Sequence, residues 1–178
     1  MLGRYENFPE NIHAIVHLNC QNSAKAVQKA ILCTVHKMNH EICDLCALNP
    51  YLEQKCEVGF EFGVAEGFNF NFLDQKELDH SLKSVDETEL QTLDFFFAVR
   101  YHLVKEDNKR VPLKFDYHVL RFIFEEGGLE MRIRHEKGIQ RATLEDLTTY
   151  ITEKINADLA QRRLAPLFLE DFQKVGLA

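Results

Sequence analysis

The sequence lacks the features that would place the protein in a membrane or on nucleic acid. No apolar run approaches the roughly 18 residues that a membrane-spanning helix requires. Residues 1–7 contain no apolar core of a signal peptide. The formal net charge of −7 disfavours binding to nucleic acid phosphates or to an anionic membrane. We therefore expect a cytoplasmic protein that has neither of these partners.

The glycine motifs of the common catalytic sites are also absent. The chain contains no nucleophile elbow, no phosphate-binding loop and no dinucleotide-binding glycine motif. Gly59 and Gly63 lie within a strand pattern, where glycine indicates bending or the close approach of another group. The five cysteines are an odd number, which is typical of reduced cytosolic thiols and not of a disulfide framework. The sequence thus leaves catalysis open and favours a binding protein.

What the chain does contain is apolar residues in regular patterns. Its 178 residues include 14 Phe, and 46% of all residues are hydrophobic, which is typical of a globular domain. We predict one domain over residues 1–164. The tail over residues 165–178 keeps several apolar residues, so we expect it to pack on this domain or on a partner.

The stretch from residue 93 to 135 carries the clearest pattern, with three runs in which apolar residues recur at every second position. Side chains at alternate positions of a strand point to opposite faces of a sheet. The polar segment 105–110 and the pair Gly127-Gly128 separate the runs, which therefore predict three consecutive antiparallel strands. The apolar face of such a meander must be covered by the rest of the chain.

Further elements are predicted on both sides of this meander. Alternation predicts a strand over residues 12–20 and an aromatic hairpin over residues 57–72. Helical spacing predicts helices over residues 24–38, 41–48, 75–84 and 143–163. Ser23, Asp74 and Thr143 are suited to cap three of these helices, and Thr143 and Asp146 together form a capping box.

These elements predict an α+β fold with an antiparallel sheet of about six strands, packed on one face by helices that include a long C-terminal helix. The order of elements resembles the helix-grip architecture of START-like proteins and also a TBP-like arrangement. The resemblance implies a sheet that curves around the last helix. An apolar pocket could lie between them, or Phe60, Phe62, Phe95 and their neighbours could fill the space as a close-packed core.

One string of metal-ligand residues runs from the end of the first predicted helix into the second, namely His36, His40, Cys43 and Cys46. Zinc accepts all four as ligands. On one continuous helix the first and last of them would lie about 15 Å apart, so they could converge on one ion only if the chain breaks near Asn39. Alternatively, the two cysteines are small buried residues on a helix face.

A second candidate site is the sheet face opposite the core. If the apolar alternates of each strand face inward, a set of basic and imidazole side chains points outward: His13, His17, Arg100, His118, Arg132 and Arg134. Clustered Arg and His could bind a phosphate or a carboxylate. A solvated face with cross-strand ion pairs explains the same pattern.

Basic residues also precede the last predicted helix. Arg134, His135 and Arg141 come shortly before its N-terminus, where free backbone N–H groups attract anions. Glu136 and Glu145 compete for the same role as carboxylates of the chain itself. The region is therefore a third candidate site, which either binds an external anion or is occupied by a carboxylate of the chain itself.

Three functions of different classes are consistent with these patterns. The leading one is a non-enzymatic protein that binds a small amphipathic or anionic ligand, either between the sheet and the C-terminal helix or on the Arg/His face. The second is a homo-oligomeric interaction subunit that uses the apolar tail and an open sheet edge. The third is a metal-dependent enzyme with zinc at the string of four residues described above.

Overall fold

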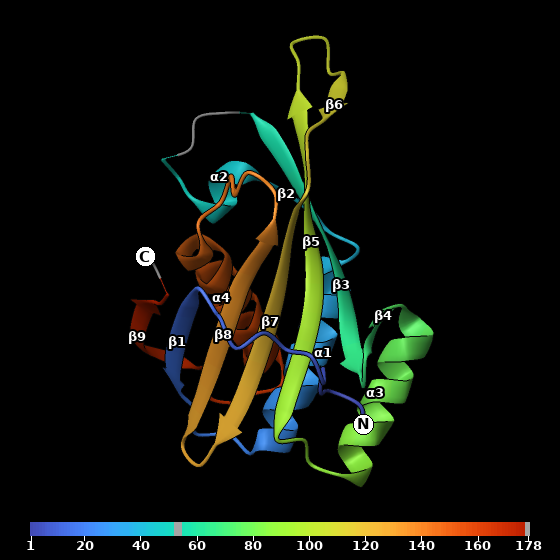
Figure 1. Ribbon diagram of the computed structural model, residues 1–178, viewed down its shortest axis with the longest axis vertical. Coiled ribbons are helices and arrows are strands. Elements are labelled where there is room, and N and C mark those ends of the chain that lie inside the picture. The colour runs from blue at the N-terminus through green and yellow to red at the C-terminus, as the bar shows by residue number, and fades with distance from the viewer. Residues whose placement is uncertain (52–54, 177–178) are drawn as a thin grey trace.

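The alternating segments form the centre of one antiparallel sheet with helices on one side (Figure 1). The computed structural model describes residues 1–51 and 55–176. Within these residues the sheet has nine strands: β1 (Ala14–Asn19), β2 (Ile42–Asp44), β3 (Cys56–Glu66), β4 (Asn69–Phe72), β5 (Thr92–Val104), β6 (Arg110–Pro112), β7 (Asp116–Glu125), β8 (Gly128–Lys137) and β9 (Phe168–Lys174). Their order is β2-β3-β5-β7-β8-β1-β9, with β4 paired to β3 and β6 paired to β5.

The helices pack on a single face of this sheet. They are α1 (Ala24–Met38), α2 (Leu45–Leu48), α3 (Gln75–Glu87) and α4 (Leu144–Gln161). The side chains of Ser23 and Asp74 accept hydrogen bonds from backbone N–H groups in the first turns of α1 and α3. At α4, Thr143 and Asp146 form the predicted capping box. In the part of the chain that the structure describes, no helix combines the length and apolarity needed to cross a membrane.

The core lies between the sheet and these helices. The rings of Phe62 and Phe97 stack with centroids 4.8 Å apart, and Phe95 packs edge-on against both Phe62 and Phe122. All four side chains are fully buried. The aromatic face of the central strands is therefore a close-packed core, in which rings meet in the stacked and edge-to-face arrangements that aromatic pairs favour.

The opposite face of the sheet, here called the open face, carries none of the helices formed by residues 1–51 and 55–176. Residues 1–13, the N-terminal segment, cross this face in front of β8, β7 and β5 (Figure 1). The Gly3 backbone N–H donates to the Ala65 carbonyl at one end of the segment, and the Arg134 guanidinium donates to the Asn11 carbonyl at the other. The segment therefore covers only part of the open face.

The α+β fold with its antiparallel sheet and long C-terminal helix is confirmed, but the expected number of strands is wrong. The three additional strands are short β2, short β6 and edge strand β9, which pairs with β1. The helix expected over residues 41–48 is also wrong, because residues 42–44 pair with β3 and only Leu45–Leu48 is helical.

Candidate functional site

A groove runs along α4 on the helix side of the sheet, between this helix and the edge formed by β1 and β9. Part of the groove is a cavity of about 200 Å³. Val16, Leu18 and Phe172 supply apolar lining from the two strands, and Thr148 and Thr152 contribute hydroxyl groups from the helix. The groove exists because β9 extends the sheet beyond the strands that α4 covers. It combines an apolar floor with polar groups, as small-molecule sites do.

A second cavity, of about 290 Å³, continues this groove towards the N-terminus of α4. The two cavities share Glu145 and Phe172 as lining residues, so they adjoin. His13 and Lys174 line the second cavity together with Thr143, the N-cap of α4. One end of the groove is therefore apolar, whereas the other carries a fixed positive charge beside the positive end of a helix dipole.

Most basic residues expected on the open face are there, but they are paired with carboxylates of the same face. The two ring nitrogens of His17 lie 2.5 Å from Asp171 and 3.1 Å from Glu130. The hydrogen bond to Asp171 raises the pKa of His17. Arg132 lies 2.7 Å from Glu130, and Arg134 lies 3.2 Å from Glu136.

Arg100 lies on the same face and explains a glycine in the neighbouring strand. Its guanidinium lies over Gly59, where a Cβ atom would stand 3.1 Å from one guanidinium nitrogen. Glu61 is its ion-pair partner, at 3.4 Å. The expected close approach to a strand glycine is thus confirmed. Because these basic residues already have anionic partners, the face resembles a network of ion pairs, within β8 and between neighbouring strands, more than a vacant anion site.

The expected placement of His118 on the open face is wrong. Its side chain is fully buried on the helix side, with its ring stacked on Phe97 at a centroid distance of 4.8 Å. Neither ring nitrogen has a hydrogen-bond partner within the described chain. Burial, reinforced by the nearby His135, lowers the pKa of His118 to about 3. His118 is therefore a neutral core residue.

The anion near the start of α4 is one of the protein's own carboxylates. The backbone N–H groups of Gln140 and Arg141 donate to the two oxygens of Asp116, at 2.7 and 3.1 Å, and His135 lies 3.3 Å from it. Burial alone would raise the pKa of Asp116, but these donors outweigh burial and lower it. Gly138 allows the contact, because its φ is +116° and a Cβ there would overlap Asp116. The anion site is thus internal.

The four residues of the predicted zinc string are not brought together as a ligand set. The rings of His36 and His40 are in contact, with centroids 4.9 Å apart, but Cys43 lies on β2 near the Tyr150 hydroxyl and Cys46 lies exposed in α2. Burial raises the pKa of the Cys43 thiol, which disfavours the thiolate that zinc requires. The first helix does end near Asn39, as convergence of the four ligands on one ion would require. The chain then enters strand β2 and does not return to the histidines.

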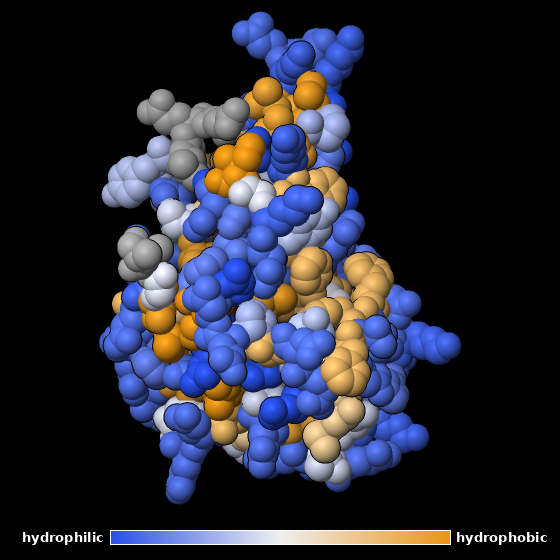
Figure 2. Space-filling view, in the orientation of Figure 1, coloured by the Kyte–Doolittle hydropathy of each residue, from blue (hydrophilic) through white to orange (hydrophobic). Residues whose placement is uncertain are grey.

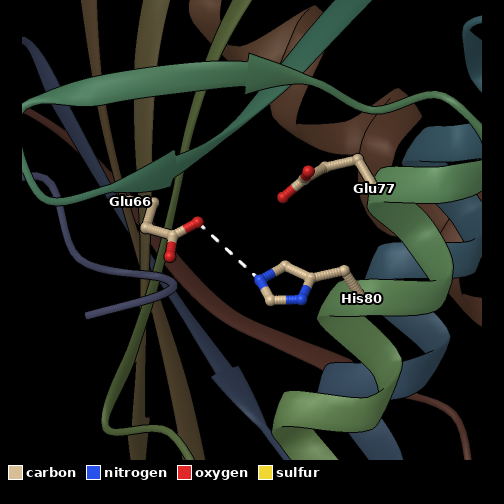
Figure 3. Close-up of side chains that lie close together, drawn as sticks. All are labelled: Glu66, Glu77 and His80. Atoms are coloured by element: carbon tan, nitrogen blue, oxygen red, sulfur yellow. Dashed lines mark ion pairs between the residues drawn. The ribbon is translucent and has the colours of Figure 1, made fainter.

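A different group of metal-ligand side chains lies where β3 meets α3. Ligand atoms of Glu66, Glu77 and His80 all lie within 4.8 Å of one another, and this is the one such group in residues 1–51 and 55–176. Figure 3 shows Glu66 and His80 facing each other, at an Nε2–Oε2 distance of 3.8 Å. The Asn71 amide donates to both carboxylates. The cluster could hold a divalent cation, but these internal bonds account for its geometry without an ion.

Sequence reasoning missed the groove because β9 was not expected to pair with β1. Its one usable signal was the apolar content of residues 167–175, which indicated packing but not the partner. Comparisons of the chain with protein-family models, with curated proteins and with solved structures give no match. The function therefore has to be inferred from the chain's own residues.

Proposed function

We propose that the protein is a non-enzymatic binding protein for a small amphipathic molecule, which lies in the groove along α4. The observation that supports this function is the continuity of the two cavities, of about 200 and 290 Å³, through Glu145 and Phe172. Together they are in the size range of about 300–1,000 Å³ that is usual for small-molecule sites. The apolar part of the ligand contacts Val16, Leu18 and Phe172, and an anionic head lies at Lys174.

The charge at the polar end gives this ligand its orientation. Lys174 is the one residue with a permanent positive charge among those lining the second cavity, and the N-terminus of α4 adds a partial positive charge. Glu145 also lies there, in the first turn of α4, where the helix dipole partly compensates its charge. A carboxylate or sulfonate head is therefore favoured over a cationic one.

Two fluorescent probes of similar apolar shape test the groove. Anilinonaphthalene sulfonate carries an anionic head, and phenylnaphthylamine carries none. We expect both to bind saturably, and Lys174→Glu to weaken the anionic probe about fivefold to tenfold while leaving the neutral probe nearly unchanged. Thr149→Phe, which places a ring in the groove from the exposed side of α4, should weaken both probes.

The matched control is Phe168→Ala. Phe168 is an exposed apolar residue of β9, the strand that carries Lys174, but it does not line the groove. Its variant should bind both probes like the original protein. Absence of saturable binding, or equal affinities with and without the Thr149 substitution, would count against a ligand in this groove.

A second candidate function is self-association through β9. Within the described residues no strand pairs with its outer edge, and Phe168 and Leu169 are 55% and 61% exposed. An unpaired edge with exposed apolar side chains is a template for another strand. Antiparallel pairing with a second copy, centred on Phe172, would set Glu170 opposite Lys174 of that copy.

This pairing has a charge-swap test. The variants Glu170→Lys and Lys174→Glu should each be monomeric, because each sets like charges opposite one another, whereas their equimolar mixture should form a heterodimer. Native mass spectrometry distinguishes the species by mass. A protein that remains monomeric at every concentration measured would remove this candidate.

A further inference from the structure

A row of aromatic side chains lies on the open face, far from the α4 groove. Tyr5 of the N-terminal segment, Phe70 of β4, Phe96 of β5 and Tyr117 of β7 follow one another, with neighbouring ring centroids 4.5, 5.7 and 5.7 Å apart. All four rings are half-buried, so part of each ring is accessible. Figure 2 shows hydrophobic residues gathered on this side of the molecule, over β4 and β5. Aromatic rings concentrated on an exposed face indicate a binding surface.

Three of these rings, those of Tyr5, Phe70 and Phe96, form one side of a hollow, here called the aromatic hollow, with a volume of about 710 Å³. Its lining includes Tyr5, Phe70, Phe96, Glu10, Arg134 and Glu136. Tyr5 and Phe70 are inclined at 46°, and Phe70 and Phe96 at 45°, so the rings bend around the hollow and do not form a flat platform. A flat nucleobase stacks best on a flat platform, whereas rings inclined to each other can surround a compact group.

The charges around the hollow favour a positive occupant. Two carboxylates and one guanidinium line it, and the guanidinium is paired with one of these carboxylates, so one negative charge is left. Arg134 donates to the Asn11 carbonyl at 2.6 Å and pairs with Glu136 at 3.2 Å. Glu10 has no ion-pair partner among the residues that the structure describes. The remaining negative charge agrees in sign with the net charge of the chain, −7.

We propose that the aromatic hollow binds an organic cation, of the alkylated ammonium type, against the rings of Phe70 and Phe96. The faces of aromatic rings carry negative charge density and attract cations that are weakly hydrated. The carboxylate of Glu10 adds a long-range attraction of the same sign, because the charges of Glu136 and Arg134 offset each other. The hollow is larger than one trimethylammonium group, so the cationic head belongs to a larger molecule. This site does not depend on the α4 groove, which lies on the other face and favours the opposite charge.

Choline and its neutral carbon isostere, in which a tert-butyl group replaces the trimethylammonium group, test the proposal. The two probes have nearly the same shape, so their difference in affinity reports the charge. NMR titration of the full chain should show choline shifting the signals of Phe70 and Phe96, with a Kd at least about tenfold lower than that of the isostere. Phe96→Leu should weaken choline about threefold to tenfold, and Phe70→Leu should do the same.

Phe72→Leu is the matched control. Phe72 belongs to the same strand as Phe70 and is 54% exposed, but it does not line the hollow, so its variant should bind choline normally. Replacing Glu10 with Gln should weaken choline and leave the isostere unchanged. Equal affinities for choline and the isostere would overturn the proposal, as would tighter binding of adenosine monophosphate than of choline. Choline binding that neither Phe variant changes would place the cation elsewhere.

Discussion

Replacing Arg121 with Met should lower the free energy of unfolding by about 3–5 kcal/mol, because it leaves a buried carboxylate without its cation. The Arg121 guanidinium donates to the two oxygens of Asp94 at 2.8 and 2.7 Å. The Asp94 side chain is fully buried, and that of Arg121 is only 15% exposed. Burial raises the pKa of Asp94 even with Arg121 in place, so its removal should raise that pKa further. Urea unfolding measures the loss.

This ion pair also holds the N-terminal segment on the open face. Asp94 accepts the Tyr5 backbone N–H at 2.7 Å, while Arg121 donates to the Tyr5 carbonyl and lies over the Phe8 ring, 4.2 Å from its centroid. The Arg121 variant should therefore detach the wall of the aromatic hollow that Tyr5 forms. Proteolysis near the N-terminus, faster in the variant than in the original protein, would report this detachment.

Two further variants separate the buried charge from other effects of the Arg121 substitution. Asp94→Asn combined with Arg121→Met removes both charges and keeps an acceptor for the Tyr5 N–H, so it should recover most of the lost stability. Arg132→Met should cost less than about 1 kcal/mol, because that side chain is 41% exposed. The deficit of the single Arg121 variant should also shrink as the pH falls, because protonation neutralises Asp94. A deficit that is independent of pH would contradict the buried-charge explanation.

The meander could be predicted from the sequence, but the inner face of β7 could not. Alternation shows that Val119 and Leu120 point to opposite faces, and it does not show which face is covered, since both sets in β7 contain apolar residues. The structure pairs Leu120 with Phe95 of β5, which sets Asp116 and His118 on the helix side as well. Two polar residues on the buried face of one strand contradict the usual pattern, and only the neighbouring strands reveal them.

The non-local pairings account for the other differences. Asn39 ends α1, and its side chain accepts the Phe62 N–H at 2.6 Å and donates to the Phe62 carbonyl. This attachment to β3 directs the following residues into β2. Cys43 therefore lies on a strand and does not join His36 and His40 in one ligand set. β9 likewise forms because β1 offers an edge, which a local spacing rule cannot show. The same edge makes the α4 groove.

His118→Phe should remove a large part of the loss of stability that the protein shows on acidification. In the folded state the pKa of His118 is lowered to about 3, whereas a histidine in the unfolded chain titrates near its ordinary value of 6.5. The unfolded state therefore binds a proton first as the pH falls. The contribution of His118 to the free energy of unfolding is fully present above pH 6.5. It falls progressively below that pH, by about 2 kcal/mol between pH 7 and pH 5. Phe cannot titrate, so its variant should lack this loss.

The charged groups around His118 fix the sign of this effect. His135 and His13 disfavour a positive charge at His118, and Asp116 favours one, but burial is the largest cause and acts with the two histidines. His17→Gln is the control of opposite sign, because the Asp171 hydrogen bond raises the pKa of His17 and its stabilising contribution is present below pH 6.5. That variant should become slightly more sensitive to acid than the original protein.

The two ring nitrogens of His118 determine how stable its variants are at neutral pH. Both are buried without a hydrogen-bond partner in the described residues, so the imidazole has lost its contacts with water and gained none in return. An apolar ring stacked on Phe97 avoids that cost, and His118→Phe should be as stable as the original protein at pH 7.5 or more stable. His118→Leu provides a smaller side chain should Phe crowd the site. Unfolding free energies measured between pH 7.5 and 5 give the slope, and an unchanged slope in both variants would show that another group carries the acid sensitivity.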